Sequence, residues 1–264
     1  MIHSVHKTLP SLTQTALLHV KGKLVNREQL RRFLHIYQSS SPSYLLMASI
    51  DNALQYVEET GGKAFTAFAQ NYRKLHESLA ACKKLQFLPL EPGRQDIGKL
   101  LISTKITNIS GKKLYDILLK EYHLQLEMAA ETYALAMFTV NDEREGFERL
   151  QSALLQIDAS LGEAGGDSAQ KAFYQTSGKN TANLPAISLA RAWDMDKSFV
   201  KLQDSVGCYA GEFVNLYPPG IPLLVPGEKI AEPIIKNIIR YEIAGLTVQG
   251  IKVREGKIQI CVLK

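Results

Sequence analysis

Near its start the chain reads Ser4-Val5-His6-Lys7-Thr8-Leu9-Pro10, and much further along it reads Tyr217-Pro218-Pro219-Gly220-Ile221-Pro222. A lysine that attacks an aldehyde must first lose its proton, so it needs neighbours that favour the neutral amine. The second stretch holds prolines, which restrict φ and remove backbone N–H donors. It is therefore predicted to form a rigid extended loop or the edge of a sheet.

The first motif can be interpreted in two ways. By itself, Ser-x-His-Lys is four common residues, and a solvated tail would explain it equally well. After the lysine comes Gln14, among the small residues Thr13, Thr15 and Ala16. Together with the proline-rich stretch, this pattern resembles the bacterial Orn/Lys/Arg decarboxylases, pyridoxal-phosphate (PLP) enzymes whose Ser-x-His-Lys lysine forms the cofactor Schiff base.

The resemblance implies roles for the residues of the first motif. Lys7 corresponds to the catalytic lysine that carries the cofactor. Ser4 and His6 correspond to cofactor-binding residues, since a hydroxyl and an imidazole just upstream of the lysine can hydrogen-bond a phosphate. The implied cofactor is pyridoxal 5'-phosphate, and no metal is expected.

A hydroxyl-rich segment, Ser39-Ser40-Ser41-Pro42-Ser43, is a second point of resemblance. In this fold family a comparable turn reaches the partner's cofactor phosphate, because free hydroxyls at a helix N-terminus suit an anion. The resemblance implies that Ser39, Ser40 and Ser41 bind the cofactor across a dimer interface. The alternative is a hydroxyl-rich helix cap, and both interpretations can hold together.

The proline-rich stretch lies near the active-site entrance in the family that the chain resembles. A basic substrate needs an acidic residue for its distal ammonium or guanidinium group. Glu212 and Glu228 are the local candidates for binding such a substrate. The alternative is that the prolines only form a structural corner.

The resemblance also raises the question of completeness. In the family, the acid for the pyridine nitrogen, the group stacked on the ring and the phosphate-binding turn all precede the lysine, whereas six residues precede Lys7 here. We therefore expect a PLP-dependent decarboxylase of lysine, ornithine or arginine, a carbon–carbon lyase of polyamine metabolism, that is truncated and inactive alone. The alternative is a non-catalytic remnant, or a subunit that associates with an intact decarboxylase or with a missing N-terminal half. A homodimer or another homo-oligomer is the expected assembly.

Composition narrows the class of protein. The chain has 264 residues, of which 45% are hydrophobic and 22% charged, as in ordinary globular proteins. Its net charge of +5 is spread without a run of five or more like charges, so no nucleic-acid partner is expected. The longest apolar stretches are far shorter than the roughly 18 residues of a membrane span, so no membrane partner is expected. Cys82, Cys208 and Cys261 form no C-x-x-C pair, which predicts reduced thiols in a cytoplasmic protein.

The hydrophobic pattern predicts an α/β protein, α+β overall. Helices are predicted over residues 27–37, 44–59 and 65–83, with a break at Gly61-Gly62, and then over 111–121, 143–157 and 232–241. Strands, or for the first of them a buried turn, are predicted over residues 12–20, 87–90, 100–104, 124–128, 133–140, 207–214 and 223–225. A closing hairpin is predicted over 248–253 and 257–263, turning at Glu255-Gly256.

Four segments follow from the pattern and the resemblance. Residues 1–84 resemble the last part of a PLP-binding large domain, and residues 85–160 are predicted to form a small α/β domain. The segment 161–183 is rich in glycine and hydroxyl residues and is the predicted linker. Residues 184–264 resemble the C-terminal domain of the Orn/Lys/Arg decarboxylases.

Overall fold

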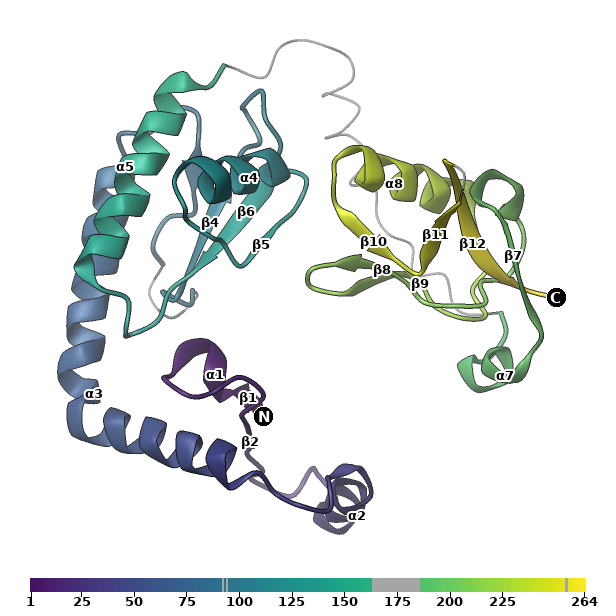
Figure 1. The fold of residues 1–264 in the computed structure, drawn as a ribbon, viewed down its shortest axis with the longest axis horizontal. Coiled ribbons are helices and arrows are strands. Elements are labelled where there is room, and N and C mark those ends of the chain that lie inside the picture. Colours follow the sequence, from purple (N-terminus) through teal and green to yellow (C-terminus); the bar gives the residue numbers. More distant parts are fainter. Residues whose placement is uncertain (92, 94, 163–185, 255) are drawn as a thin grey trace. The chain divides into compact units, whose positions relative to one another are not determined.

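The computed structural model describes residues 1–91, 93, 95–162, 186–254 and 256–264. Its helices and strands are labelled in Figure 1, and their mixture confirms the predicted α/β class. The described residues divide into two compact units. The first consists of Met1–Ala81, Leu90–Leu100 and Met137–Leu155, and the second of Cys82–Pro89, Leu101–Ala136 and Gln156–Lys264.

This division crosses the four predicted segments, because Leu90–Leu100 and Met137–Leu155, within the predicted small domain over 85–160, belong to the first unit. The boundaries of the predicted segments stay a prediction. The predicted linker over 161–183 lies, from residue 163 onward, outside the described residues.

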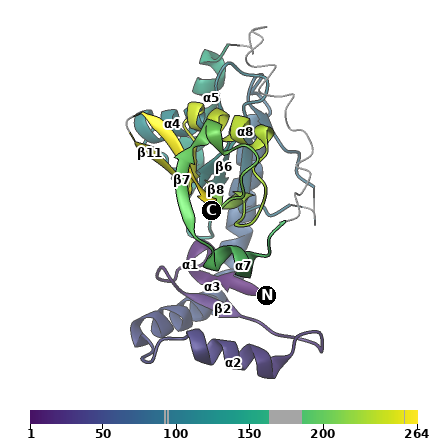
Figure 2. The same ribbon diagram turned by 90° about the vertical axis from the view of Figure 1, so that its right-hand side faces the viewer.

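The start of the chain forms a two-stranded sheet that encloses a single helical turn. Strand β1 (Ile2–Ser4) pairs antiparallel with β2 (Ala16–Leu18), and α1 (Val5–Thr8) follows β1 directly. The predicted strand or buried turn over residues 12–20 is therefore a strand only in its middle. Figures 1 and 2 show this segment beside the first half of α3, where a hydrogen bond joins the two.

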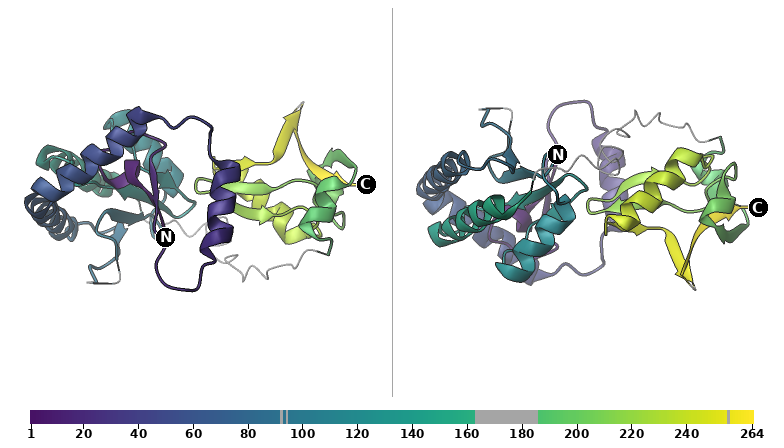
Figure 3. Two further views of the ribbon diagram at one scale, coloured as in Figure 1. Left: turned by 90° about the horizontal axis from the view of Figure 1, so that it is seen from below. Right: turned by 90° about the horizontal axis from the view of Figure 1, so that it is seen from above.

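Helix α2 (Arg27–Tyr37) confirms the predicted helix over the same residues. The side chain of Asn26 accepts a hydrogen bond from the backbone N–H of Gln29, which satisfies one of the unpaired donors at the helix start. No residue of α2 is buried. In Figure 3 extended segments connect α2 to its neighbours in sequence.

Helix α3 corrects the prediction of two helices. It is one continuous helix (Tyr44–Leu79) that includes Gly61-Gly62, where a break was predicted. Gly61 is buried, and an added Cβ there would lie 3.3 Å from a side-chain carbon of Val57. A glycine inside a helix costs about 1 kcal/mol relative to alanine, and packing along the helix offsets that cost.

Asp158, on helix α5 (Arg144–Ser160), holds the chain just after α3. Its two carboxylate oxygens accept hydrogen bonds from the backbone N–H groups of Lys83 (2.9 Å), Lys84 (2.8 Å) and Leu85 (2.7 Å). The Asp158 side chain is buried at 6% exposure. Burial raises the pKa of this carboxyl, but the three N–H donors and the nearby Lys84 outweigh it, so the pKa is lowered overall.

We expect Asp158→Asn to lower the free energy of unfolding by about 2–3 kcal/mol, because an amide has one acceptor oxygen where the carboxylate offers two. The lowered pKa adds stability that is present above the unfolded-state pKa of about 3.9 and is lost as the pH falls through the lower folded-state value. Urea denaturation at several pH values measures both effects. As a control, Asp142 accepts one N–H, from Thr139, at the surface, and Asp142→Asn should cost less than about 1 kcal/mol. Equal losses in the two variants would contradict this expectation.

A four-stranded sheet in the order β3-β4-β6-β5 occupies the middle of the chain. Its strands are β3 (Gln86–Phe87), β4 (Lys99–Ser103), β5 (Met128–Ala129) and β6 (Tyr133–Met137), and the helices of this part are α4 (Gly111–Glu121) and α5. The predicted helices over 111–121 and 143–157 and the predicted strands over 100–104 and 133–140 are confirmed with small shifts. The predicted strand over 124–128 is wrong except at Met128, because the backbone N–H of Leu124 bonds to the carbonyl of Leu118 and closes the end of α4.

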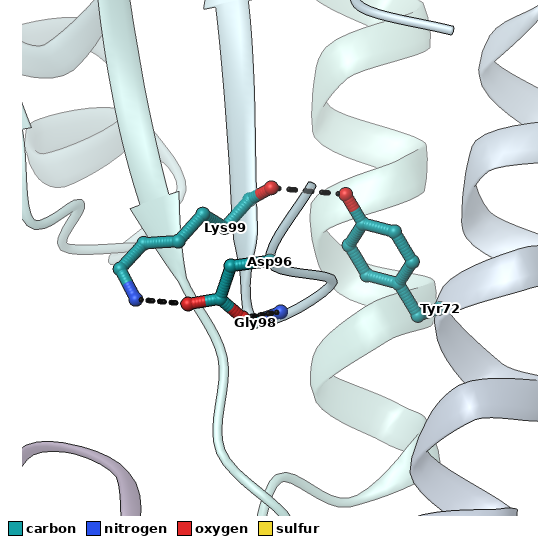
Figure 4. Close-up of polar contacts among 4 residues, drawn as sticks. All are labelled: Tyr72, Asp96, Gly98 and Lys99. Carbon is teal, nitrogen blue, oxygen red and sulfur yellow. Dashed lines mark hydrogen bonds and ion pairs between the residues drawn. The ribbon is translucent and has the colours of Figure 1, made fainter. Parts of the chain in front are cut away.

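A polar cluster, shown in Figure 4, lies at the start of β4. Asp96 accepts a hydrogen bond from the backbone N–H of Gly98 (2.8 Å) and pairs with the Lys99 ammonium (2.9 Å). The Tyr72 hydroxyl donates to the carbonyl of Lys99 at 3.0 Å. Burial, with a smaller effect of Asp96, raises the pKa of Tyr72 to about 12. This cluster fixes the entry into β4, so its polar groups build the fold.

The last part of the chain holds two three-stranded sheets, in the orders β10-β8-β9 and β11-β12-β7. The strands are β7 (Lys197–Lys201), β8 (Val214–Tyr217), β9 (Ile221–Leu224), β10 (Thr247–Gln249), β11 (Ile251–Arg254) and β12 (Lys257–Leu263). Helix α8 (Glu232–Ile243) confirms the predicted helix over 232–241 and lies over the first sheet in Figures 1 and 3. Its Ile238 is buried in one core cluster with Val214 and Val248 of the strands.

The strand prediction over 207–214 is wrong. Gly207 has φ +86° and the segment forms a turn with isolated bridges, so β8 begins only at Val214. Strand β7 and the short helix α7 (Leu189–Asp194) were not predicted from the sequence. The proline-rich stretch joins β8 to β9, and β9 is an edge strand, which confirms the predicted edge.

The closing hairpin is confirmed, with Arg254 opposite Lys257 where β11 turns into β12. The predicted first arm over 248–253 is, however, divided into β10 and β11. Gly250 separates them with φ +88°, and a Cβ at Gly250 would lie 1.9 Å from the carbonyl oxygen of Phe213. The close approach of the Phe213 backbone requires glycine here.

Candidate functional site

The lysine of the first motif lies on α1, which is a single helical turn. Lys7 is exposed, His6 is half-buried and Val5 is buried. The backbone N–H of Leu9 bonds to the carbonyl of Val5 at 3.0 Å and closes the turn. Ser4 is the N-cap residue of α1, and its side chain makes no cap hydrogen bond. The structure therefore carries Ser4, His6 and Lys7 on one tight turn, which we call the lysine turn (residues 4–9).

Thr15 contacts the lysine turn through its backbone carbonyl. Its carbonyl oxygen lies 3.1 Å from the backbone nitrogen of Val5 and 2.9 Å from Nδ1 of His6. Thr15 is 1% exposed, although it is polar. Two donors of the lysine turn thus converge on one buried carbonyl.

Two serines extend these contacts to α3. The Ser11 hydroxyl lies 2.8 Å from that of Thr15 and 3.1 Å from that of Ser49, a residue of α3. The backbone N–H of Leu12 donates to Ser49 at 2.7 Å. Sequence reasoning missed Ser11 and Ser49 and gave Thr15 no role of its own. The four-residue spacing of Ser11 and Thr15 was the only visible signal, and nothing in the sequence pairs Ser49 with them.

Gln14 has a backbone conformation that is uncommon for a residue with a side chain. Its φ is +80°. Left-handed backbone costs an ordinary L-residue about 1–2 kcal/mol and persists where surrounding contacts enforce it. Gln14 directly precedes Thr15, so it belongs to the turn that places the Thr15 carbonyl against Val5 and His6.

The serines of the second segment lie between α2 and α3 and are exposed. Ser39 donates to the carbonyl of Ser41 at 3.2 Å, and Ser43 accepts from the backbone N–H of Leu46 at 3.3 Å. Ser43 is thus the residue that caps α3, while Ser39, Ser40 and Ser41 precede it. Their contact with a partner's cofactor stays a prediction.

The two predicted substrate carboxylates have partners within the chain. Glu212 pairs with Lys197 at 3.2 Å, and the Lys197 ammonium lies 4.6 Å from the centre of the Trp193 ring. Glu228 accepts a hydrogen bond from the backbone N–H of Val225 at 2.9 Å, closing the turn between them. Glu212 is 42% exposed and its pair can open toward a ligand, whereas Glu228 closes a turn. Their role in substrate binding stays a prediction.

Comparison with known families identifies the chain. The model for the Orn/Lys/Arg decarboxylase major domain matches residues 1–97, and the model for the C-terminal domain of the same family matches residues 167–253. The chain belongs to the Orn/Lys/Arg decarboxylase family. Residues of the lysine turn lie within the major-domain match.

Individual relatives agree with this membership. The chain is 28% identical to an arginine decarboxylase of Bacillus subtilis over 94% of its length, and 29% identical to one of Halalkalibacterium halodurans, also over 94%. These matches cover 51% of each relative, so the chain spans about half the length of the curated relatives that it matches.

Solved structures show the same fold. The constitutive lysine decarboxylase of E. coli matches with a TM-score of 0.76 and 17% identity, over 100% of this chain and 49% of that one. A lysine decarboxylase of Francisella novicida matches with a TM-score of 0.77 and 18% identity, over 100% of this chain and 48% of that one. Among the described residues, no helix is long and apolar enough to cross a membrane, and no group of three or more histidine, cysteine, aspartate or glutamate side chains could hold a metal ion.

The lysine turn fits one end of the cofactor that the family implies. PLP carries an aldehyde, which a primary amine attacks, and a phosphate, which accepts hydrogen bonds. Lys7 is an exposed residue with a primary amine, on a turn that is tied to the buried Thr15, and Ser4 on the same turn has a hydroxyl. These residues are suited to covalent attachment of the cofactor.

Proposed function

We propose that the chain is the lysine-bearing part of a PLP-dependent decarboxylase of a basic amino acid, and that Lys7 attaches the cofactor. The observation that carries the proposal is the lysine turn, in which the exposed residue Lys7 lies on a helical turn tied to the buried Thr15. Membership of the Orn/Lys/Arg decarboxylase family supports the reaction class. Arginine decarboxylases among its relatives and lysine decarboxylases among its structural neighbours support a basic substrate without choosing one.

In this proposal each of the following candidate site residues has a defined task. Bound PLP supplies an electron sink for the electron pair that remains when carbon dioxide leaves. Lys7 supplies the amine for attachment, and the Ser4 hydroxyl donates to the phosphate. Ser39, Ser40 and Ser41 would donate to the phosphate of a second subunit. Glu212 would bind the distal cation of the substrate by exchanging its Lys197 partner for it.

Borohydride reduction tests the attachment site. After incubation with PLP, reduction should place the pyridoxyl label on Lys7 in preference to exposed lysines such as Lys23 and Lys63. The reason is that hydrogen bonds fix the backbone of the lysine turn, which carries Lys7. Peptide mapping by mass spectrometry measures the label. Lys7→Ala should lose the preferred label, and Lys23→Ala should keep it. Label spread evenly over surface lysines would overturn the assignment of Lys7.

A second role, as a partner subunit, is favoured by the exposed apolar side chains of the first unit. Leu12 is 47% exposed, Leu45 71% and Phe33 47%. Large exposed apolar side chains that form a contiguous patch are typical of surfaces that bind protein. The proposed occupant is a second copy of the chain, or the half of the family's length that these residues do not span.

We expect association in solution, with residues 1–80 ordered only when their apolar side chains are covered. Light scattering combined with limited proteolysis measures both properties. A monodisperse monomer whose first 80 residues resist protease as well as the C-terminal residues do would contradict this expectation.

A further inference from the structure

The hydrogen bonds around the lysine turn define where several protons lie. The oxygen of the Thr15 carbonyl can only accept, so the His6 nitrogen that contacts it, Nδ1, must carry a hydrogen. In a neutral imidazole the other nitrogen, Nε2, then has a lone pair and no hydrogen. Neutral His6 can therefore accept a hydrogen bond or a proton at Nε2, but it cannot donate from that atom.

The donor and acceptor roles of the Thr15, Ser11 and Ser49 hydroxyls follow from the same kind of argument. Thr15 donates its single hydroxyl hydrogen to the carbonyl of Leu12 at 2.8 Å. Ser11 must then donate to the Thr15 hydroxyl oxygen, and Ser49 must donate to Ser11, because each hydroxyl has one hydrogen. Ser49 in turn accepts from the backbone N–H of Leu12. The chain of donors thus runs in one direction from α3 to Thr15.

We propose that this Ser49–Ser11–Thr15 hydroxyl chain positions the lysine turn on α3 and that the Thr15 carbonyl holds His6 in the Nδ1–H tautomer. The strained backbone of Gln14 supports the proposal, because such strain persists only where contacts such as those of Thr15 enforce it. The hydroxyl chain and the two bonds to the Thr15 carbonyl connect α3 to Val5 and His6, the residues just before Lys7.

The inference rests on the proposed function in one respect: His6 acts on the cofactor only if Lys7 attaches PLP. Neutral His6 becomes a proton acceptor beside Lys7, and His6 can donate to a phosphate only as the imidazolium. Thr15, Ser11 and Ser49 are positioning residues, since they act on Lys7 through the backbone and through His6.

Nitrogen NMR of the imidazole rings tests the tautomer without any cofactor. In alkaline solution, where imidazoles are neutral, His6 should show a protonated Nδ1 and an unprotonated Nε2. Thr15→Val and Ser49→Ala should each shift His6 toward a mixture of tautomers, because the Thr15 carbonyl is no longer held. Thr15→Ser keeps a hydroxyl and should restore the signature. Ser78→Ala is the matched control, since Ser78 lies on α3 and donates to the carbonyl of Leu75 in its own helix.

The pyridoxyl label on Lys7 gives the second measurement. It should fall several-fold in Ser49→Ala and Thr15→Val, and it should be kept in Thr15→Ser and Ser78→Ala. A protonated Nε2 on His6 in the unaltered chain would overturn the inference. So would an unchanged tautomer and label in both Ser49→Ala and Thr15→Val. If the tautomers behave as expected while no chain is labelled at Lys7, the inference about His6 is supported and the proposed function fails.

Discussion

Purified by itself, the 264-residue chain is expected to show no measurable decarboxylation of lysine, ornithine or arginine. It spans about half the length of its curated relatives. The resemblance to the family implies that the acid for the ring nitrogen and the phosphate-binding turn precede the lysine. Loss of one preorganised group of this kind costs about 3 kcal/mol of transition-state stabilisation, and every 1.36 kcal/mol is about tenfold in rate. A polypeptide that lacks both groups is therefore predicted to have a rate about 10⁴-fold or more below that of an enzyme that has them.

Release of carbon dioxide from each amino acid, with PLP in excess, measures this expectation. Robust turnover by the purified chain that disappears in Lys7→Ala and survives in Lys23→Ala would contradict it. Turnover that survives in Lys7→Ala would instead indicate a contaminating enzyme.

The second large effect concerns Gly250, between β10 and β11. We expect Gly250→Ala to lower the free energy of unfolding of the C-terminal residues by about 2–5 kcal/mol. Alanine at φ +88° costs about 1–2 kcal/mol, and its Cβ would overlap the Phe213 carbonyl oxygen at 1.9 Å, which adds about 1–3 kcal/mol of overpacking. Chemical denaturation followed by circular dichroism measures the loss.

Gly256 provides the matched control for this variant. It also has a positive φ, +71°, but no atom lies within 4 Å of an added Cβ. Gly256→Ala should therefore cost only the backbone term of about 1–2 kcal/mol. Equal losses at Gly250 and Gly256 would show that the contact with Phe213 has no effect.

Helices were predicted best where a capping residue and a helical repeat of apolar residues agree. Asn26 and Ser110 each accept a backbone N–H at the starts of α2 and α4, and both helices have the predicted bounds. The prediction failed at Gly61, where packing along α3 outweighs the local preference of glycine. It also failed at β7, whose pairing with β12 joins residues far apart in sequence.

Local chemistry and family membership could be read from consecutive residues. The lysine motif lies on one turn because its residues are neighbours in the chain, so no distant contact was needed to group Ser4, His6 and Lys7. The proline-rich stretch was likewise predicted as a rigid extended loop or an edge, because prolines lack the N–H that a central strand requires.

Long-range contacts could not be read in this way. Ser11 and Ser49 are 38 positions apart, and their hydroxyls meet only because the β1–β2 segment lies against α3. The same holds for Glu212, which pairs with Lys197 at a separation of 15 positions, and for Asp158, which binds backbone N–H groups at Lys83 to Leu85. Such contacts depend on which surfaces are buried together and on where backbone donors lack partners, and neither property is local to a stretch of sequence. Residue order therefore identified the family and predicted the role of Lys7, whereas packing decided which groups hold its turn in place.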